Sequence, residues 1–142
     1  MNPIFKTEEK RRVCTLVPYY TEDGSHYFFV QKRSAEQTQP HSLGLFGGGM
    51  EGEETIEETI EREIREELEI AISGHRFFST YEFAKNINHV FVLETEPGFA
   101  ERVTVREGEW GRFISAKEIL EHPDVLDGAR VIFSQINRFL GA

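Results

Sequence analysis

Residues 47–70 read GGGMEGEETIEETIEREIREELEI, and the rest of the chain is organised around this stretch. It opens with three glycines, and no Pro or Gly interrupts it after Gly52. Thr55 is a favourable helix N-cap, and Glu58, three residues later, completes a capping box. Apolar residues then recur at helical spacing, at Ile56, Ile60, Ile64 and Leu68. The stretch therefore predicts a glycine-rich loop followed by an amphipathic helix.

This helix is crowded with carboxylates, since residues 51–69 hold ten Glu and two Arg. Most charge runs are solvated surfaces, and oppositely charged pairs four residues apart stabilise an exposed helix by about 0.2–0.5 kcal/mol each. Glu63 and Glu67 do not fit that explanation, because no basic residue lies three or four positions from either. With Glu66 they place three carboxylates on one side of the helix, beside its apolar stripe. Such a group favours a hard divalent cation, Mg²⁺ or Mn²⁺.

In this register the residues resemble the signature of the Nudix hydrolases, G-x5-E-x7-R-E-U-x-E-E-x-G-U, where U is a bulky apolar residue. The match covers residues 48–70, at Gly48, Glu54, Arg62, Glu63, Ile64, Glu66, Glu67 and Ile70. The one mismatch is Glu69, where the family has glycine. Position 69 falls where the helix should end, so the mismatch concerns the geometry of the C-cap and removes no ligand.

The resemblance implies roles for these residues. The implied metal ligands are Glu63, Glu66, Glu67 and the backbone carbonyl of Gly47. Glu54 and Arg62 are implied to pair with each other and so to fix the glycine-rich loop against the helix. The resemblance also implies an α/β fold, an α/β/α sandwich with a central mixed β-sheet.

The remaining sequence fits that architecture. We expect strands at residues 12–20, 26–33, 72–83, 89–95, 103–106 and 110–114, with the first two joined by a turn at Asp23-Gly24. We expect helices at residues 115–122 and 128–140, the latter with an apolar face of Val131, Ile132, Ile136 and Leu140. Residues 34–43 read as a polar loop. A mixed sheet with helices on both faces is the simplest arrangement for this order.

Length and composition bound the interpretation. The 142 residues fit a single domain over residues 1–142. No apolar run approaches the roughly 18 residues of a membrane span, and the N-terminus lacks the apolar segment of a secretory signal. Cys14 is the only cysteine and forms no internal disulfide, so we expect a cytoplasmic protein. The formal charge of −9 argues against a groove for long nucleic acid. A monomer and a homodimer both remain open.

Three candidate site residues lie outside the signature. Glu107 and Glu109 occupy an acidic loop before the last predicted strand, and in related enzymes a glutamate from a late loop often completes the metal site or acts as the base. Glu107 is the first choice because Gly108 allows a sharp approach, although two solvated loop acids explain the residues equally well. Arg33 ends the second strand, where a cation could clamp a diphosphate. A surface position explains Arg33 equally well.

The leading hypothesis is metal-dependent hydrolysis of the diphosphate linkage in a nucleoside diphosphate joined to a group X, such as a nucleotide sugar, a dinucleotide or a (d)NTP. A bound metal lowers the pKa of water, and a carboxylate takes the proton. Glu66, Glu107 and Glu109 all remain open as that base. Backbone at Gly48 is expected to approach the phosphates.

Two other functions are compatible with parts of the sequence. One is a catalytically silent module that senses a nucleotide on the same fold, and the other is an acidic surface for binding a protein. The intact Glu63, Glu66 and Glu67 argue against the first, and the register of Gly48 with Arg62 argues against the second. The sequence does not name the substrate, because the signature binds only the part that all substrates share.

Overall fold

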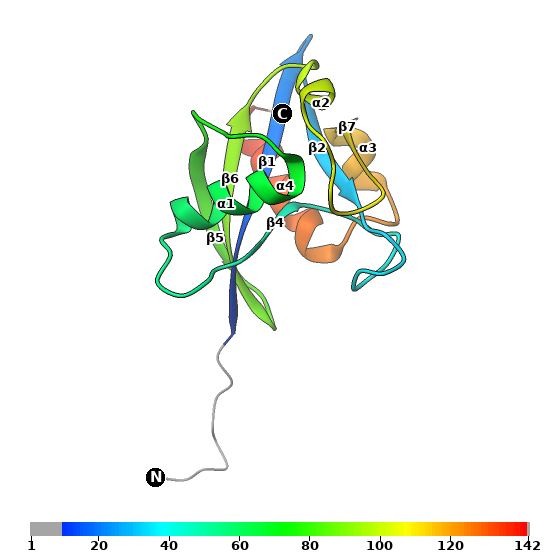
Figure 1. Ribbon diagram of the computed structural model, residues 1–142. Coiled ribbons are helices and arrows are strands. Elements are labelled where there is room, and N and C mark those ends of the chain that lie inside the picture. Colours follow the sequence, from blue (N-terminus) through cyan, green and yellow to red (C-terminus); the bar gives the residue numbers. More distant parts are fainter. Residues whose placement is uncertain (1–9, 142) are drawn as a thin grey trace.

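The computed structural model describes residues 10–141. A seven-stranded sheet lies at its centre in the order β3-β2-β1-β6-β5, with β4 paired to β1 and β7 paired to β2 (Figure 1). The strands are β1 (Arg11–Glu22), β2 (Ser25–Lys32), β3 (Leu43–Gly44), β4 (Phe46–Gly49), β5 (Arg76–Glu82), β6 (Asn86–Glu94) and β7 (Trp110–Ser115). The helices are α1 (Ile56–Leu68), α2 (Phe99–Arg102), α3 (Ala116–Glu121) and α4 (Asp127–Phe139).

Strand β1 is the central strand of the sheet. It runs parallel to β6, while on its other side its first half pairs with β4 and its second half pairs with β2, both antiparallel. The β1–β2 hairpin turns at Asp23 and Gly24, whose φ angles of 52° and 80° lie in the left-handed region that such two-residue turns use. The mixed sheet and the hairpin therefore confirm the sequence prediction.

Two hydrophobic cores cover the two faces of the sheet, because side chains alternate along each strand. Leu16 and Phe29 are fully buried in the core beneath α1, whereas Val17 and Phe28 are fully buried in the core beneath α4. The helices α1 and α4 thus lie on opposite faces (Figure 1). This is the α/β/α sandwich that the sequence predicts.

Several sequence expectations about elements are wrong. Residues 46–49 form strand β4 rather than a loop, because the glycines pair with β1. Residues 103–106 form no strand; Thr104 N–H and Arg106 N–H instead donate to the carbonyls of Leu68 and Glu67, at 3.0 and 2.7 Å, and so satisfy the end of α1. Residues 72–75, the start of the strand expected at residues 72–83, also form no strand, since β5 begins at Arg76. Neither the short helix α2 nor the two-residue strand β3 was predicted.

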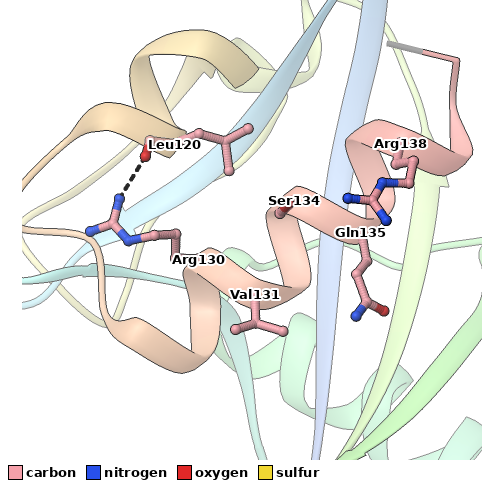
Figure 2. A pocket seen from close by; sticks show the side chains of 6 residues that line it. All are labelled: Leu120, Arg130, Val131, Ser134, Gln135 and Arg138. Carbon is pink, nitrogen blue, oxygen red and sulfur yellow. Dashed lines mark hydrogen bonds between the residues drawn. The ribbon is translucent and has the colours of Figure 1, made fainter.

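The buried face of α4 also differs from its prediction. Val131 is 44% exposed, and Phe133 takes a fully buried place in the core instead. Figure 2 shows Val131 on the side of α4 that faces away from the sheet. In the same view Arg130 donates to the carbonyl of Leu120 at 2.9 Å, and this guanidinium also reaches the carbonyls of His122 and Val125. Arg130 therefore fastens α4 to the end of α3.

Among residues 10–141 no helix is both long enough and apolar enough to cross a membrane.

Candidate active site

Helix α1 begins at a complete capping box. Thr55 Oγ1 accepts from Glu58 N–H at 3.1 Å, and Glu58 Oε1 accepts from Thr55 N–H at 2.9 Å. The apolar stripe then anchors the helix on the sheet, with Ile60, Ile64 and Leu68 fully buried. Because the stripe fixes the rotation of the helix, the residues just beside it lie toward β4.

Glu67 is one of those residues, and it is buried. The side chain is only 3% exposed, and its Oε1 accepts a long hydrogen bond of 3.4 Å from Gly47 N–H. Its Oε2 is buried with no hydrogen-bond partner. Burial raises the pKa of Glu67 well above its usual range, and the nearby carboxylates of Glu63 and Glu107 raise it further. A buried carboxylate with a free oxygen is a position that a bound cation would satisfy.

Glu63 lies beside Glu67, against strand β4. A Cβ atom at Gly48 would overlap the Glu63 carboxylate, so this acid occupies the space that any other residue at position 48 would fill. Gly47 is equally constrained, since its φ is 147° and a Cβ there would overlap the carbonyl of Cys14. The glycines therefore bring backbone and carboxylates together. A direct contact of Gly48 with a substrate phosphate remains a prediction.

Arg62 links the acids of the site. Its guanidinium makes two hydrogen bonds to Glu54, at 2.7 and 2.9 Å, and a third of 2.9 Å to the carbonyl of Gly49. The hydrogen bonds from Arg62 lower the pKa of Glu54 most, and a hydrogen bond from Glu51 N–H lowers it further, to about 2. The geometry places this pair between the segment after β4 and the helix.

The same guanidinium donates to Glu63 at 2.9 Å, which corrects the expectation that Glu63 has no basic partner. Residues adjacent in sequence do not usually face each other on a helix, but here both side chains lie against β4. Of the four oppositely charged pairs that lie four residues apart on this helix, only Arg62–Glu66 forms; Glu58–Arg62, Glu61–Arg65 and Arg65–Glu69 do not. Glu58 serves the capping box, Glu61 lies 3.9 Å from His75, and Glu69 pairs with Arg106.

Glu66 does not join Glu63 and Glu67. Its side chain is 59% exposed and lies 3.3 Å from the Arg62 guanidinium. Within residues 10–141 no three His, Cys, Asp or Glu side chains lie in a group that could hold a metal ion, so the expected convergence of three carboxylates is not seen in this conformation. The residues nevertheless fit a hard cation, because the donors are oxygens and Glu67 offers a buried one that nothing else satisfies.

The two remaining candidates for the base, Glu107 and Glu109, lie in the same acidic loop but have different neighbours. Glu107 lies close enough to Glu67 for its charge to raise that residue's pKa, and it accepts a hydrogen bond of 3.1 Å from Gln37. Glu109 instead lies 4.0 Å from His41 Nδ1. The structure thus brings Glu107, but not Glu109, toward the buried carboxylates. The polar loop before β3 offered no signal that would have identified Gln37.

Arg33 is occupied by its own loop. Its Nε donates to the carbonyl of Thr38 at 2.6 Å, and its Nη2 donates to Thr38 Oγ1 at 2.9 Å. In this conformation the guanidinium therefore holds the loop at residues 34–42. A role in binding phosphate remains a prediction.

Glu69 ends α1 in the manner expected of a glycine. Its φ and ψ are 54° and 37°, and its N–H donates to the carbonyl of Arg65 at 3.1 Å. The left-handed conformation costs a non-glycine residue about 1 kcal/mol. The mismatch in the signature therefore leaves the path of the chain intact at a small energetic cost.

Comparison with known proteins gives one family and many similar folds. A family model described as the NUDIX domain matches residues 10–135. A search of curated proteins finds no match. Among 383 matching chains of solved structures, three illustrate the likeness.

The first comes from a study of MutT from Aliivibrio salmonicida and Vibrio cholerae, with 18% identity, a TM-score of 0.74, and coverage of 92% of this chain and 99% of that one. The second is the NUDIX domain of Shewanella oneidensis NrtR complexed with ADP ribose, with 14% identity, a TM-score of 0.75, and coverage of 99% and 94%. The third is a MutT NUDIX hydrolase from Burkholderia pseudomallei, with 20% identity, a TM-score of 0.73, and coverage of 91% and 99%. At these identities the likeness shows the fold alone.

Proposed function

The chain belongs to the Nudix hydrolase family, and from this premise we propose that it uses a divalent cation to hydrolyse the diphosphate linkage of a nucleoside diphosphate joined to a second group. The observation that carries the proposal is the pair Glu63 and Glu67. Two carboxylates lie together against β4, and one of them is buried with an oxygen that no residue satisfies. The burial of Glu67 does not stabilise the fold by itself, because burying a carboxylate oxygen without a partner costs free energy.

Glu63, Glu67 and the carbonyl of Gly47 would hold the cation, and Glu66 would turn from Arg62 to join them. The bound cation would neutralise charge on phosphate oxygens and lower the pKa of water. Mg²⁺ and Mn²⁺ suit these donors, since both prefer oxygen ligands. Arg62 keeps Glu63 in reach of the site through a hydrogen bond of 2.9 Å.

The reaction itself needs a proton acceptor, and we assign that role to Glu107. The oxygen of water adds to one phosphorus of the linkage, the bond from that phosphorus to the bridging oxygen breaks, and the bridging oxygen leaves with the other phosphate. The proton lost by the water passes to the Glu107 carboxylate. Glu107 is favoured because its charge acts on Glu67, whose carbonyl accepts from the neighbouring Arg106 N–H at 2.7 Å, whereas Glu109 lies by His41 and Glu66 is engaged by Arg62.

The substrate class is proposed on chemistry and on one comparison. A cation held by the carboxylates would bind the diphosphate, the group that every candidate substrate shares. The complex of the Shewanella oneidensis NUDIX domain with ADP ribose supports a small nucleotide as the ligand. The panel of compounds to be tested as substrates therefore begins with ADP-ribose and continues with nucleotide sugars, dinucleoside polyphosphates and oxidised dNTPs.

The test is a product assay on this panel with purified protein, with and without millimolar Mg²⁺ or Mn²⁺. We expect at least one compound to give a nucleoside monophosphate and a phosphorylated second product, separated by chromatography, and chelation with EDTA to abolish turnover. Absence of turnover across the panel would overturn the proposal. Tight binding of a nucleotide without turnover would instead favour the silent sensing module.

A further inference from the structure

The loop at residues 34–42 is more ordered than its polar sequence predicts. Arg33 N–H donates to the carbonyl of Ser42 and His41 N–H donates to that of Arg33, both at 2.9 Å, so the two ends of the loop are joined. Gln37 lies within this closed loop, which runs beside the late acidic loop (Figure 1). Its side chain connects the two loops.

The orientation of the Gln37 amide follows from its neighbours. Ser34 N–H can only donate, and it donates to Gln37 Oε1 at 2.6 Å, so the Nε2 amino group must lie on the opposite side. That group donates to Gln31 Oε1 at 3.3 Å and to Glu107 Oε1 at 3.1 Å. Both amide hydrogens are thereby used, and one of them is directed at the proposed base.

The backbone around Glu107 is fixed independently of Gln37. Gly108 has a φ of 92°, and a Cβ there would crowd Gln31 Cγ and the Lys32 carbonyl, each within 2.7 Å. The same carbonyl accepts from Glu109 N–H at 2.8 Å. Glu107 is itself exposed, so its backbone is anchored to β2 while its carboxylate is free to turn unless a side chain holds it.

We propose that Gln37 is a positioning residue, whose amide holds the Glu107 carboxylate toward Glu67 during hydrolysis. This inference rests on the proposed function, because it assumes that Glu107 accepts the proton of the attacking water. Gln37 need not touch the substrate or the metal, and acts through the orientation of Glu107. Misplacing a reacting group by about 1 Å can cost up to about 100-fold in rate.

The variant Gln37→Glu separates this role from that of holding the loop. A glutamate keeps an oxygen that can accept from Ser34 N–H, but it offers no donor to Glu107 and sets a second negative charge beside it. We expect kcat to fall about 10-fold in Gln37→Ala and at least as much in Gln37→Glu, with KM changing little. A role confined to the loop would leave Gln37→Glu with normal turnover.

A double-mutant cycle with Glu107→Gln sharpens the test. Glu107→Gln removes the base and should cost about 100-fold or more in kcat. In that background Gln37→Ala should cost no more than about 2-fold, because there is no base left to position. A general disturbance of the loop would instead give the same loss in both backgrounds. Gln39→Ala is the matched control, since Gln39 is an exposed glutamine of the same loop.

The outcomes distinguish the inference from the function on which it rests. Turnover by the wild type, a defect in Glu107→Gln and normal turnover in Gln37→Glu would overturn the role of Gln37 alone. Wild-type turnover with no defect in Glu107→Gln would overturn the base assignment and the role of Gln37 together. An inactive wild type across the nucleotide panel would overturn the proposed function and this inference with it.

Discussion

The helices α1 and α4 each have 13 residues and cover opposite faces of one sheet, but they differ in the partners of their arginines and in whether they bury a charged residue. Each presents one arginine with several hydrogen bonds. Arg130 on α4 donates only to main-chain carbonyls, and every side chain that α4 buries is apolar. Arg62 on α1 donates to three carboxylates, and α1 buries Glu67.

The contrast separates what the fold requires from what the chemistry requires. The α4 face shows that this sheet can be covered by a helix whose buried side chains are all apolar. The α1 face accepts a buried carboxylate that folding alone would disfavour. Changes to Arg62 and to the carboxylates beside β4 should therefore reduce turnover while sparing the fold, and changes to Arg130 on α4 should do the reverse.

The largest expected effect is that of Glu63→Gln. An amide oxygen is a weaker ligand than a carboxylate, and losing about 4 kcal/mol of transition-state stabilisation lowers the rate on the order of 1,000-fold. Folding should be retained, because one negative charge beside Glu67 is removed. Glu61→Gln, on the same helix, is the matched control and should stay active. Equal activity in the two variants at saturating Mg²⁺ would show that Glu63 is no metal ligand and that the acidic residues of α1 have no role in catalysis.

The two arginines provide the next comparison. Arg62→Ala should lower turnover roughly 10–100-fold, the effect of losing a residue that orients metal ligands, with the fold retained. Arg130→Ala leaves several carbonyls at the end of α3 without a donor and should lower the free energy of unfolding by about 1–3 kcal/mol, with turnover per folded molecule unchanged. Steady-state kinetics and denaturant titration on both variants measure this. A loss of activity in Arg130→Ala equal to that in Arg62→Ala would break the division between the faces.

Gly48→Ala tests whether that glycine exists to make room for Glu63. The added methyl group would displace the carboxylate, which is the flexible end of a side chain, so the cost in stability should be small and turnover should fall about 10-fold. Gly98→Ala, whose Cβ would lie 3.4 Å from its nearest neighbour, is the control and should be neutral. Normal turnover in Gly48→Ala would show that the position of Glu63 beside β4 is not needed.

The smallest expected effect is that of Glu69→Gly at the end of α1. Glycine relieves the left-handed conformation, but it also frees the unfolded chain and removes the pair with Arg106, so the net gain in stability should not exceed about 1 kcal/mol. Thermal denaturation measures the change, and turnover should be unaltered. A variant destabilised by more than 1 kcal/mol would show that the pair with Arg106 holds the end of the helix.

Much of the fold could be read from local patterns. The capping box at Thr55, the apolar stripe of α1 and the turn at Asp23-Gly24 each depend on a few adjacent residues, and the structure has all three. The strand formed by Gly47 and its neighbours was missed, because glycines signal a loop until a partner strand supplies the pairing. Phe133 was likewise missed, since the rotation of α4 is set by the whole core.

The candidate site also has features that the sequence predicts and features that only the structure shows. The register of the signature identified Glu54 and Arg62, which the structure joins by two hydrogen bonds. Spacing along a helix did not reveal that Arg62 reaches Glu63, or that Glu66 turns outward. The contact of Gln37 with Glu107 links positions 70 residues apart, and only the folded chain brings them together.

Anomalous diffraction from a crystal grown with Mn²⁺ would reveal directly whether the α1 face binds a divalent cation. We expect a Mn²⁺ peak bounded by the carboxylates of Glu63 and Glu67 and the carbonyl of Gly47, with Glu66 turned away from Arg62 toward it. The same crystal form of Glu63→Gln should show a weakened peak or none. Absence of a peak beside Glu67 in the wild type at saturating Mn²⁺, or peaks only elsewhere on the molecule, would contradict cation binding at this face.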